Sequence, residues 1–178
     1  MRIRKQGRCP GVGPSAPYKF LRTHTPLMPA SSPPTSSPPA TFPPIPARNL
    51  HGRRVDVPSE LDGRLNLLVM AFQRPRQADV DTWIPHLLEL ERSVPGFRFY
   101  ELPTISPGYL PMRPIIDGGM KAGIPDDGAR KRTLTVYTRK GPLKEALGID
   151  TEDAIWQFLV GRDGRIRWRG RGVWEEGG

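Results

Sequence analysis

The sequence is poor in metal-binding and redox-active residues, since Cys9 is the one cysteine among 178 residues. A single cysteine cannot form an intramolecular disulfide, a Cys-x-x-Cys redox pair or a cysteine-based zinc site. Three histidines are widely spaced, and His86 with Glu89 would supply half of a metal site. Glycine-rich phosphate-binding motifs are missing as well. We therefore expect neither a metal nor a cofactor.

Acidic residues are missing from residues 1–55, which contain nine Lys and Arg and twelve of the 22 prolines. The whole formal net charge of +9 therefore lies there, because the remaining residues carry 18 charges of each sign. Proline-rich, hydroxyl-rich sequence buries too little surface to offset the entropy of ordering. We predict a disordered basic leader over residues 1–47.

No apolar run in the sequence approaches the roughly 20 residues of a membrane span.

Three interpretations of this leader stay open. It is a flexible extension translated from a start codon assigned too far upstream, an organelle transit peptide, or a basic arm for nucleic acid or anionic lipid. The charges lack interleaved aromatic residues, so we expect no specific nucleic-acid recognition. The expected location is the cytoplasm of a bacterium, or the mitochondrial matrix if the leader is a transit peptide.

Residues 48–178 are predicted to form one α/β domain. The apolar run over 65–72 (LNLLVMAF) is typical of a strand buried on both faces. Apolar residues at three- and four-residue steps predict a helix over 79–94, kinked by Pro85. A strand over 97–102 should place Phe97, Phe99 and Glu101 on one side.

The second half of the domain alternates in the same way. We predict, in chain order, a loop over 103–114, a short helix over 115–123, a strand over 133–138, a helix over 141–148 and strands over 154–160 and 165–168. The last two strands flank an Asp-Gly turn, which favours a hairpin. A short hairpin or edge strand over 49–58 precedes all of these. Strands separated by helices indicate a parallel or mixed sheet with helices on its faces.

These segments resemble the thioredoxin-like fold, in its peroxiredoxin and membrane-anchored thioredoxin branch. The likeness rests on the strand 65–72, the helix with Pro85, the residues Ala146-Leu147-Gly148-Ile149 and the hairpin 158–166 (FLVGRDGRI), which is similar to a peroxiredoxin FLIDxxGxI hairpin. The resemblance implies a three-layer sandwich around a mixed sheet.

The chemistry of that family does not carry over. Counting back from Pro85, the positions of the two thioredoxin cysteines hold Gln77 and Val80. The peroxiredoxin PxxxTxxC motif cannot begin at Pro75, because Asp79 and Thr82 occupy the positions of its threonine and cysteine. Residues 152–155 also lack the proline that thioredoxins place before the hairpin. Thiol chemistry needs a thiolate nucleophile, so we expect a domain without peroxidase or disulfide reductase activity.

A looser likeness concerns mitochondrial ATP synthase assembly factors, which contain a degenerate thioredoxin domain. The cysteine-free domain with Trp83 and the Arg-Ile-Arg-Trp segment is similar to them, and this implies a chaperone-like partner role. The helix that normally closes the fold is expected to be absent after the hairpin. Trp168 and Trp174 are then expected near an uncovered apolar surface.

The sequence thus favours a non-catalytic binding or assembly module whose partner is another protein. Its candidate contact residues are Tyr109 and Met112 in the loop, and Arg165, Arg167, Trp168 and Arg169 in the hairpin. Period-two alternation should place the three arginines on one face, and Ile166 with Trp168 on the other. The alternatives are a thioredoxin- or peroxiredoxin-related oxidoreductase, a redox protein acting through Cys9, or an enzyme that uses no thiol.

Overall fold

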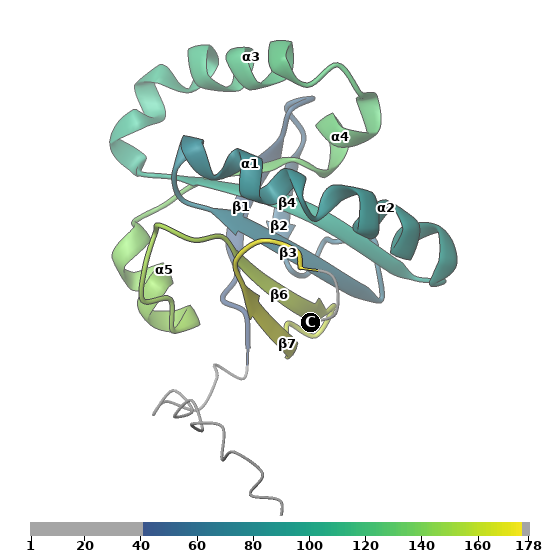
Figure 1. The fold of residues 1–178 in the computed structure, drawn as a ribbon. Helices are drawn as coiled ribbons and strands as arrows, with labels where there is room; N and C mark the ends of the chain where they lie inside the picture. The colour runs from purple at the N-terminus through teal and green to yellow at the C-terminus, as the bar shows by residue number, and fades with distance from the viewer. Residues whose placement is uncertain (1–40, 176–178) are drawn as a thin grey trace, which may run out of the picture. The chain divides into compact units, whose positions relative to one another are not determined.

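The computed structural model describes residues 41–175, which belong to one compact unit. Their seven strands form a mixed sheet with helices on both faces (Figure 1). Across the sheet, the strands are β2 (Arg54–Val57), β1 (Ile45–Asn49), β5 (Leu134–Tyr137), β4 (Phe97–Ile105), β3 (Leu65–Ala71), β6 (Trp156–Gly161) and β7 (Ile166–Arg171). Neighbouring strands among β3, β4 and β5 pair in parallel, and every other neighbouring pair in the sheet is antiparallel. The predicted mixed α/β sheet is confirmed.

Strand β3 is buried on both faces, as its unbroken apolar run predicts. On one face Leu68 and Met70 belong to the core that also contains Leu143 and Leu147 of α5 (Lys140–Leu147). On the other face Leu67 packs, with Val69, in the core beneath the helices that follow β3. The sheet is therefore the middle of three layers.

The helix predicted over 79–94 is divided in two. A short 3-10 helix, η1 (Arg74–Arg76), leads into α1 (Gln77–Asp81), and α2 (Ile84–Ser93) follows. Pro85 lies in the first turn of α2 and has no N–H to donate to a carbonyl of the preceding turn. The predicted kink is therefore a break, after which the helix restarts.

The segment between β4 and β5 differs most from its prediction. Strand β4 continues through Pro103 to Ile105, because the extended backbone that proline favours is compatible with a strand end. The loop predicted over 103–114 is therefore partly wrong: after β4 come η2 (Pro107–Met112) and α3 (Arg113–Gly123). A further helix, α4 (Asp127–Arg132), begins after Asp126, whose carboxylate accepts a hydrogen bond from the Ala129 N–H.

The N-terminal boundary of the domain lies upstream of the predicted one. Residue 47 falls inside β1, and Phe42 is buried with its ring centroid 5.7 Å from that of Phe158. The prediction that residues 41–47 belong to a disordered leader is therefore wrong, because they supply core side chains. The rest of the predicted leader lies outside the described residues.

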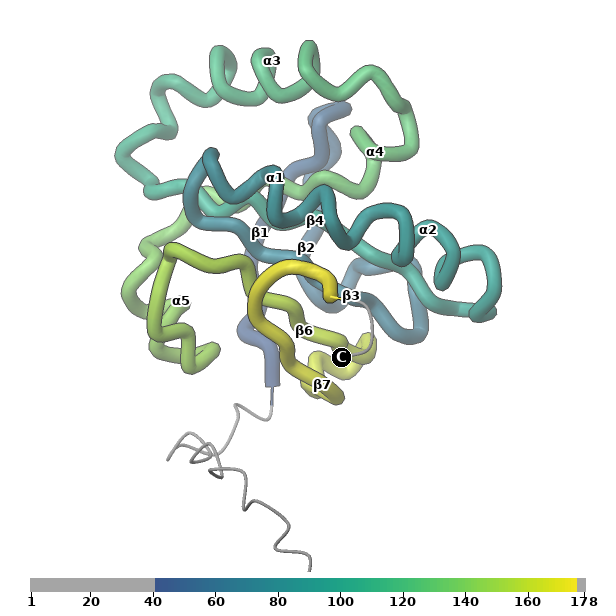
Figure 2. The backbone as a smooth tube through the Cα atoms, viewed as in Figure 1, coloured from purple at the N-terminus to yellow at the C-terminus, as the bar shows by residue number. Residues whose placement is uncertain are grey.

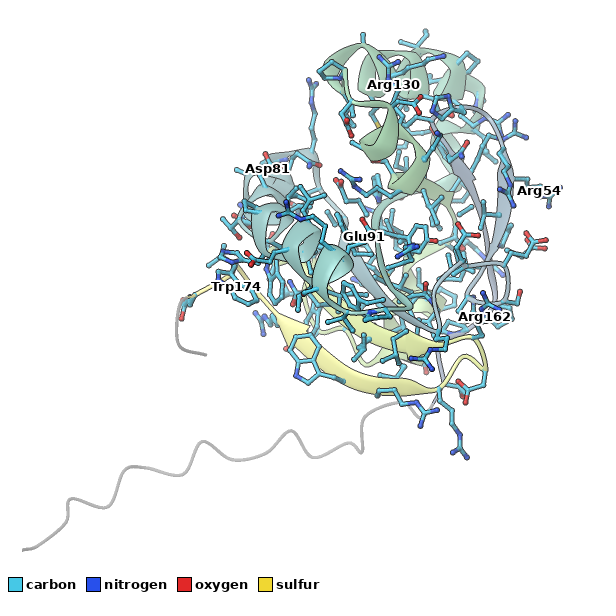
Figure 3. The ribbon with its side chains drawn as sticks, turned by 90° about the vertical axis from the view of Figure 1, so that its right-hand side faces the viewer. Arg54, Asp81, Glu91, Arg130, Arg162 and Trp174 are labelled. Carbon is cyan, nitrogen blue, oxygen red and sulfur yellow. The ribbon has the colours of Figure 1, made fainter. Side chains whose placement is uncertain are left out.

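No helix follows β7 within the described residues, and residues 172–174 instead cross toward α1 and α2. The Gly172 carbonyl accepts hydrogen bonds from the Trp83 indole at 2.9 Å and the Gln157 amide at 2.8 Å. Trp174 packs edge-on against Trp83, with ring centroids 5.0 Å apart, and stacks on His86. Figure 3 shows Trp174 beside the helices that follow β3. Trp174 is thereby partly covered, as is the face on which it lies.

Candidate functional site

A cavity of about 1030 Å³ lies where β3 and β4 end, between these strands and α3. Figure 2 shows α3 running above α1 and β4. The apolar wall of the cavity includes Phe72 and Ile105 on the sheet side and Ile116 and Met120 on the helix side. The carboxyl ends of parallel strands are where open α/β sheets commonly bind ligands, so this cavity is the first candidate site.

Of the two positions that match the thioredoxin cysteines by their spacing from Pro85, one lines this cavity and the other is buried, and neither contains a thiol. Val80 is buried in the core beneath α1. Gln77 lines the cavity, and its amide nitrogen donates to Asp81 Oδ1 at 3.0 Å and to Glu101 Oε2 at 3.3 Å. An amide linked to two carboxylates therefore occupies the position that the sequence resemblance assigns to a redox cysteine.

Glu101 is the most unusual residue of the cavity, because this acidic residue is 8% exposed and lies on a central strand. Burial raises the pKa of Glu101, and the charge of Asp81 raises it further. The hydrogen bond from Gln77 and the charge of Arg132 act in the opposite direction without cancelling the shift. Glu101 lies on the same side as Phe97 and Phe99, as its spacing predicts.

Lys140, one of the two basic residues that line the cavity, is already paired. The Lys140 ammonium donates to the Phe72 carbonyl at 2.8 Å and to Glu152 at 2.9 Å. Lys144 contacts the other oxygen of Glu152 at 3.0 Å. Burial by itself would raise the pKa of Glu152, but the hydrogen bonds from these two lysines outweigh it and lower the pKa. Lys140 therefore joins the end of β3 to α5 and its following loop.

Helix α3 forms the outer wall of the cavity and buries none of its residues. Two polar contacts fix it. The Tyr137 phenol of β5 donates to Asp117 Oδ1 at 3.0 Å, and the Arg130 guanidinium donates to the carbonyls of Ile124 and Lys121 at 2.6 and 3.0 Å. Burial and the hydrogen bond to Asp117 raise the pKa of Tyr137. Polar contacts thus hold α3 where apolar packing is scarce.

We expect Tyr137→Phe to loosen α3. A hydrogen bond to a charged group contributes about 1–2 kcal/mol at a partly exposed site, so amide exchange over α3 should accelerate about tenfold. Hydrogen-exchange mass spectrometry measures this directly. Tyr109→Phe is the matched control, since Tyr109 is 54% exposed. Equal exchange rates in both variants would show that the Tyr137 phenol does not hold α3.

The predicted contact residues of the loop lie close together on η2. Tyr109 is 54% exposed and Met112 49% exposed. Leu110 of η2 at 45% and Ile115 of α3 at 72%, which were not among the predicted residues, are further exposed apolar side chains in the same stretch of chain. We call these four residues the η2–α3 patch. Tyr109 and Ile115 also line the cavity, so the patch adjoins it.

The arginine-rich hairpin is arranged differently from its prediction. A β-bulge between Leu159 and Val160 shifts the register, so Ile166 packs in the core on the α5 side. Trp168 faces Trp83 on the opposite side. The prediction that Ile166 and Trp168 share a face is therefore wrong, because the extra residue of a bulge breaks the period-two alternation.

The hairpin guanidinium groups also contact the protein itself. Arg169 stacks over the Trp156 ring at 4.5 Å and donates to the Gly148 carbonyl, while Arg167 pairs with Asp163 at 3.1 Å. The Arg165 side chain is exposed. These arginines do not form one uniform anion-binding row, and Trp168, which is 46% exposed, lies apart from them toward Trp83.

Sequence reasoning missed the cluster of Gln77, Asp81 and Glu101. One signal was present, because an acidic residue interrupts the apolar segment FRFYEL of a central strand. Nothing in the spacing of residues 77 and 101 indicated that they would meet.

Within residues 41–175, no group of three or more His, Cys, Asp or Glu is placed to hold a metal ion. In the same range, no helix is long and apolar enough to cross a membrane.

No protein-family model matches the sequence, and neither does any curated protein. Solved structures are similar in fold. The exposed lipoprotein thioredoxin Etrx1 of Streptococcus pneumoniae is 16% identical with a TM-score of 0.50, over 75% of this chain and 92% of that one. The thioredoxin domain of a thiol-disulfide oxidoreductase from Bacteroides vulgatus is 22% identical with a TM-score of 0.50, over 76% and 91%.

A third structure, BsSco, belongs to the Sco family of cytochrome c oxidase assembly proteins. It is 18% identical with a TM-score of 0.50, over 78% of this chain and 87% of that one. Identities this low establish the fold alone. The chain therefore has a thioredoxin-like fold, as the resemblance of its strands, Pro85 helix and hairpin implies.

Proposed function

We propose that this protein is a non-catalytic binding or assembly module built on a thioredoxin-like fold. The observation that carries the proposal is the occupancy of the two redox positions by Gln77 and Val80, one bonded to carboxylates and the other buried. Thiol exchange needs a thiolate, which neither side chain supplies. A thioredoxin-like domain that lacks thiol chemistry still has the shape and the surfaces of the fold. These suit a chaperone-like role toward another protein.

The η2–α3 patch is the proposed contact surface for that protein partner. Its four apolar side chains are between 45% and 72% exposed and follow one another along a short stretch of chain. Clustered exposed apolar residues are typical of interaction sites. The hairpin is less suitable, because Arg167 and Arg169 are engaged by Asp163, Trp156 and Gly148.

We expect the double substitution Tyr109→Ser and Ile115→Ser to lower recovery of a stoichiometric partner about tenfold or more, since aromatic and apolar anchors dominate binding energy. The measurement is quantitative mass spectrometry after affinity purification of the tagged full-length chain from its own cells. Stability should change little because both side chains are exposed. Val94→Ser, also at an exposed apolar residue, is the matched control.

A partner that binds the double variant and the wild type equally would contradict the use of this patch. The oxidoreductase alternative has its own test in the same preparation. Disulfide reductase activity present in the wild type and lost in Cys9→Ser would favour a thiol function outside the domain. Partner recovery that is unchanged in Cys9→Ser supports the binding module.

A further inference from the structure

The cavity beneath α3 combines apolar walls with a polar end. Its apolar side chains include Ile116 and Met120 of α3, opposite Phe72 and Ile105. The polar end is the cluster of Gln77, Asp81 and Glu101. The volume of the whole cavity, about 1030 Å³, suits a drug-sized organic molecule. An apolar cavity with a few convergent polar groups is the usual form of a ligand site.

Glu101 receives too few hydrogen bonds for a buried carboxylate. Among the described residues it accepts one, from Gln77 at 3.3 Å, and this bond reaches Oε2. Burying an ionised carboxylate is costly unless it is paired and hydrogen-bonded. The side chain lines the cavity, so a ligand can supply the donors that the protein does not.

The surroundings of Glu101 favour a positively charged donor. Asp81 accepts from the same Gln77 nitrogen, which places a second carboxylate beside the first. Two basic residues line the cavity: Lys140 is bound by Glu152 and the Phe72 carbonyl, and Arg74 makes no ion pair or hydrogen bond with Glu101 within the described residues. Arg132 stacks on Phe99, and no ion pair within the described residues joins an arginine or lysine to Glu101.

We propose that this cavity binds a molecule with a primary ammonium group on an apolar stem. The ammonium lies between Glu101 and Asp81 and supplies N–H donors and a positive charge, while the stem lies under α3 against Ile116 and Met120. Two sources share this chemistry: a free amphiphilic amine and the lysine side chain of a peptide. The cavity adjoins the proposed partner surface at Tyr109 and Ile115, but its polar end at Glu101 and Asp81 lies outside that surface.

Two adjacent glycines of α3 offer a matched way to fill the cavity. Gly119 lines it and Gly118 does not, and a Cβ at either position would meet nothing within 4 Å. Both replacements remove a glycine from a helix interior, which stabilises the helix by up to about 1 kcal/mol. Gly119→Leu therefore obstructs the cavity in a folded protein, and Gly118→Leu controls for the helix effect.

The test is an NMR titration of the full-length chain at neutral pH with n-hexylammonium, using 1-hexanol as the uncharged probe of equal length. We expect hexylammonium to bind about tenfold or more tightly than hexanol, a difference of about 1.4 kcal/mol. Glu101→Gln should remove the preference, whereas Glu145→Gln, at an exposed carboxylate of α5, should retain it. Gly119→Leu should abolish binding of both probes, and Gly118→Leu should not.

Equal affinities of the two probes, absence of binding, or binding that survives Gly119→Leu would each overturn the proposal. An Nα-acetyl-lysine amide probe distinguishes the two sources. Affinity comparable to that of hexylammonium supports a peptide lysine as the ligand, and affinity about tenfold weaker supports a free amphiphilic amine. Partner recovery through the η2–α3 patch is measured separately, so either proposal can fail without the other.

Discussion

Trp83→Ala should lower the free energy of unfolding by about 3–5 kcal/mol, the range found for large aromatic side chains in cores. Trp83 is 9% exposed and contacts both β7 and residues 172–174. Its ring meets Trp174 edge-on and lies 6.3 Å from Trp168, and its indole N–H donates to the Gly172 carbonyl. The variant therefore loses core packing and the attachment of the C-terminal segment together.

Denaturant unfolding followed by circular dichroism measures the loss of stability. Two further variants separate the contribution of the hydrogen bond from that of the aromatic packing. Trp83→Phe keeps an aromatic ring but loses the hydrogen bond to Gly172, so we expect a loss of about 1–2 kcal/mol. Trp168→Ala removes a ring that is 46% exposed and should cost less than about 1 kcal/mol. Similar losses in Trp83→Ala and Trp168→Ala would show that Trp83 does not anchor residues 172–174.

This cluster explains how the sheet face is covered where a closing helix would lie. Thr82 Oγ1 accepts a hydrogen bond from the Trp174 N–H at 2.9 Å, and Trp174 stacks on His86 at 4.3 Å. Residues 172–174, which bend after β7 and are held by aromatic contacts, thus cover part of the face that a closing helix would cover. The face stays partly open at Trp168, which is consistent with the expectation of an apolar surface there.

The elements that the sequence predicts well are those with strong local signals. Strand β3 follows from an unbroken apolar run, and the β6–β7 hairpin follows from its Asp-Gly turn. Helix α4 was missed because its residues Asp-Gly-Ala-Arg-Lys-Arg contain no apolar stripe, although Asp126 is a suitable N-cap. The N-cap residue Asp126 was therefore the only local signal for this helix that we recognise, because hydrophobic periodicity is absent from its residues.

The candidate site was less predictable, because it depends on contacts between distant residues. Gln77 and Glu101 meet since β3 and β4 are parallel neighbours and α1 begins directly above their ends. The bulge beside Val160 likewise has no signature in the alternation of residues 165–169. Sequence periodicity describes one element at a time, whereas the cavity and the hairpin faces depend on register between elements.

Glu101→Gln is expected to change how stability depends on pH. Burial raises the pKa of Glu101 in the folded protein above its ordinary value, so the folded state holds the proton at pH values where the unfolded chain has lost it. The free energy of unfolding therefore falls as the pH rises from about 4.5 through the folded pKa, by about 1.4 kcal/mol per unit of pKa difference. Glutamine cannot ionise and removes this loss.

The measurement compares urea unfolding of wild type and Glu101→Gln between pH 4 and pH 8. Their difference should grow with pH and then level off, since Glu152 and other titrating groups are common to both proteins. Glu145→Gln, at an exposed carboxylate, should give a difference that does not vary with pH. A constant difference for Glu101→Gln would refute the raised pKa. A rising one means that the carboxylate destabilises the folded protein at neutral pH, a cost that a bound ammonium ligand would offset.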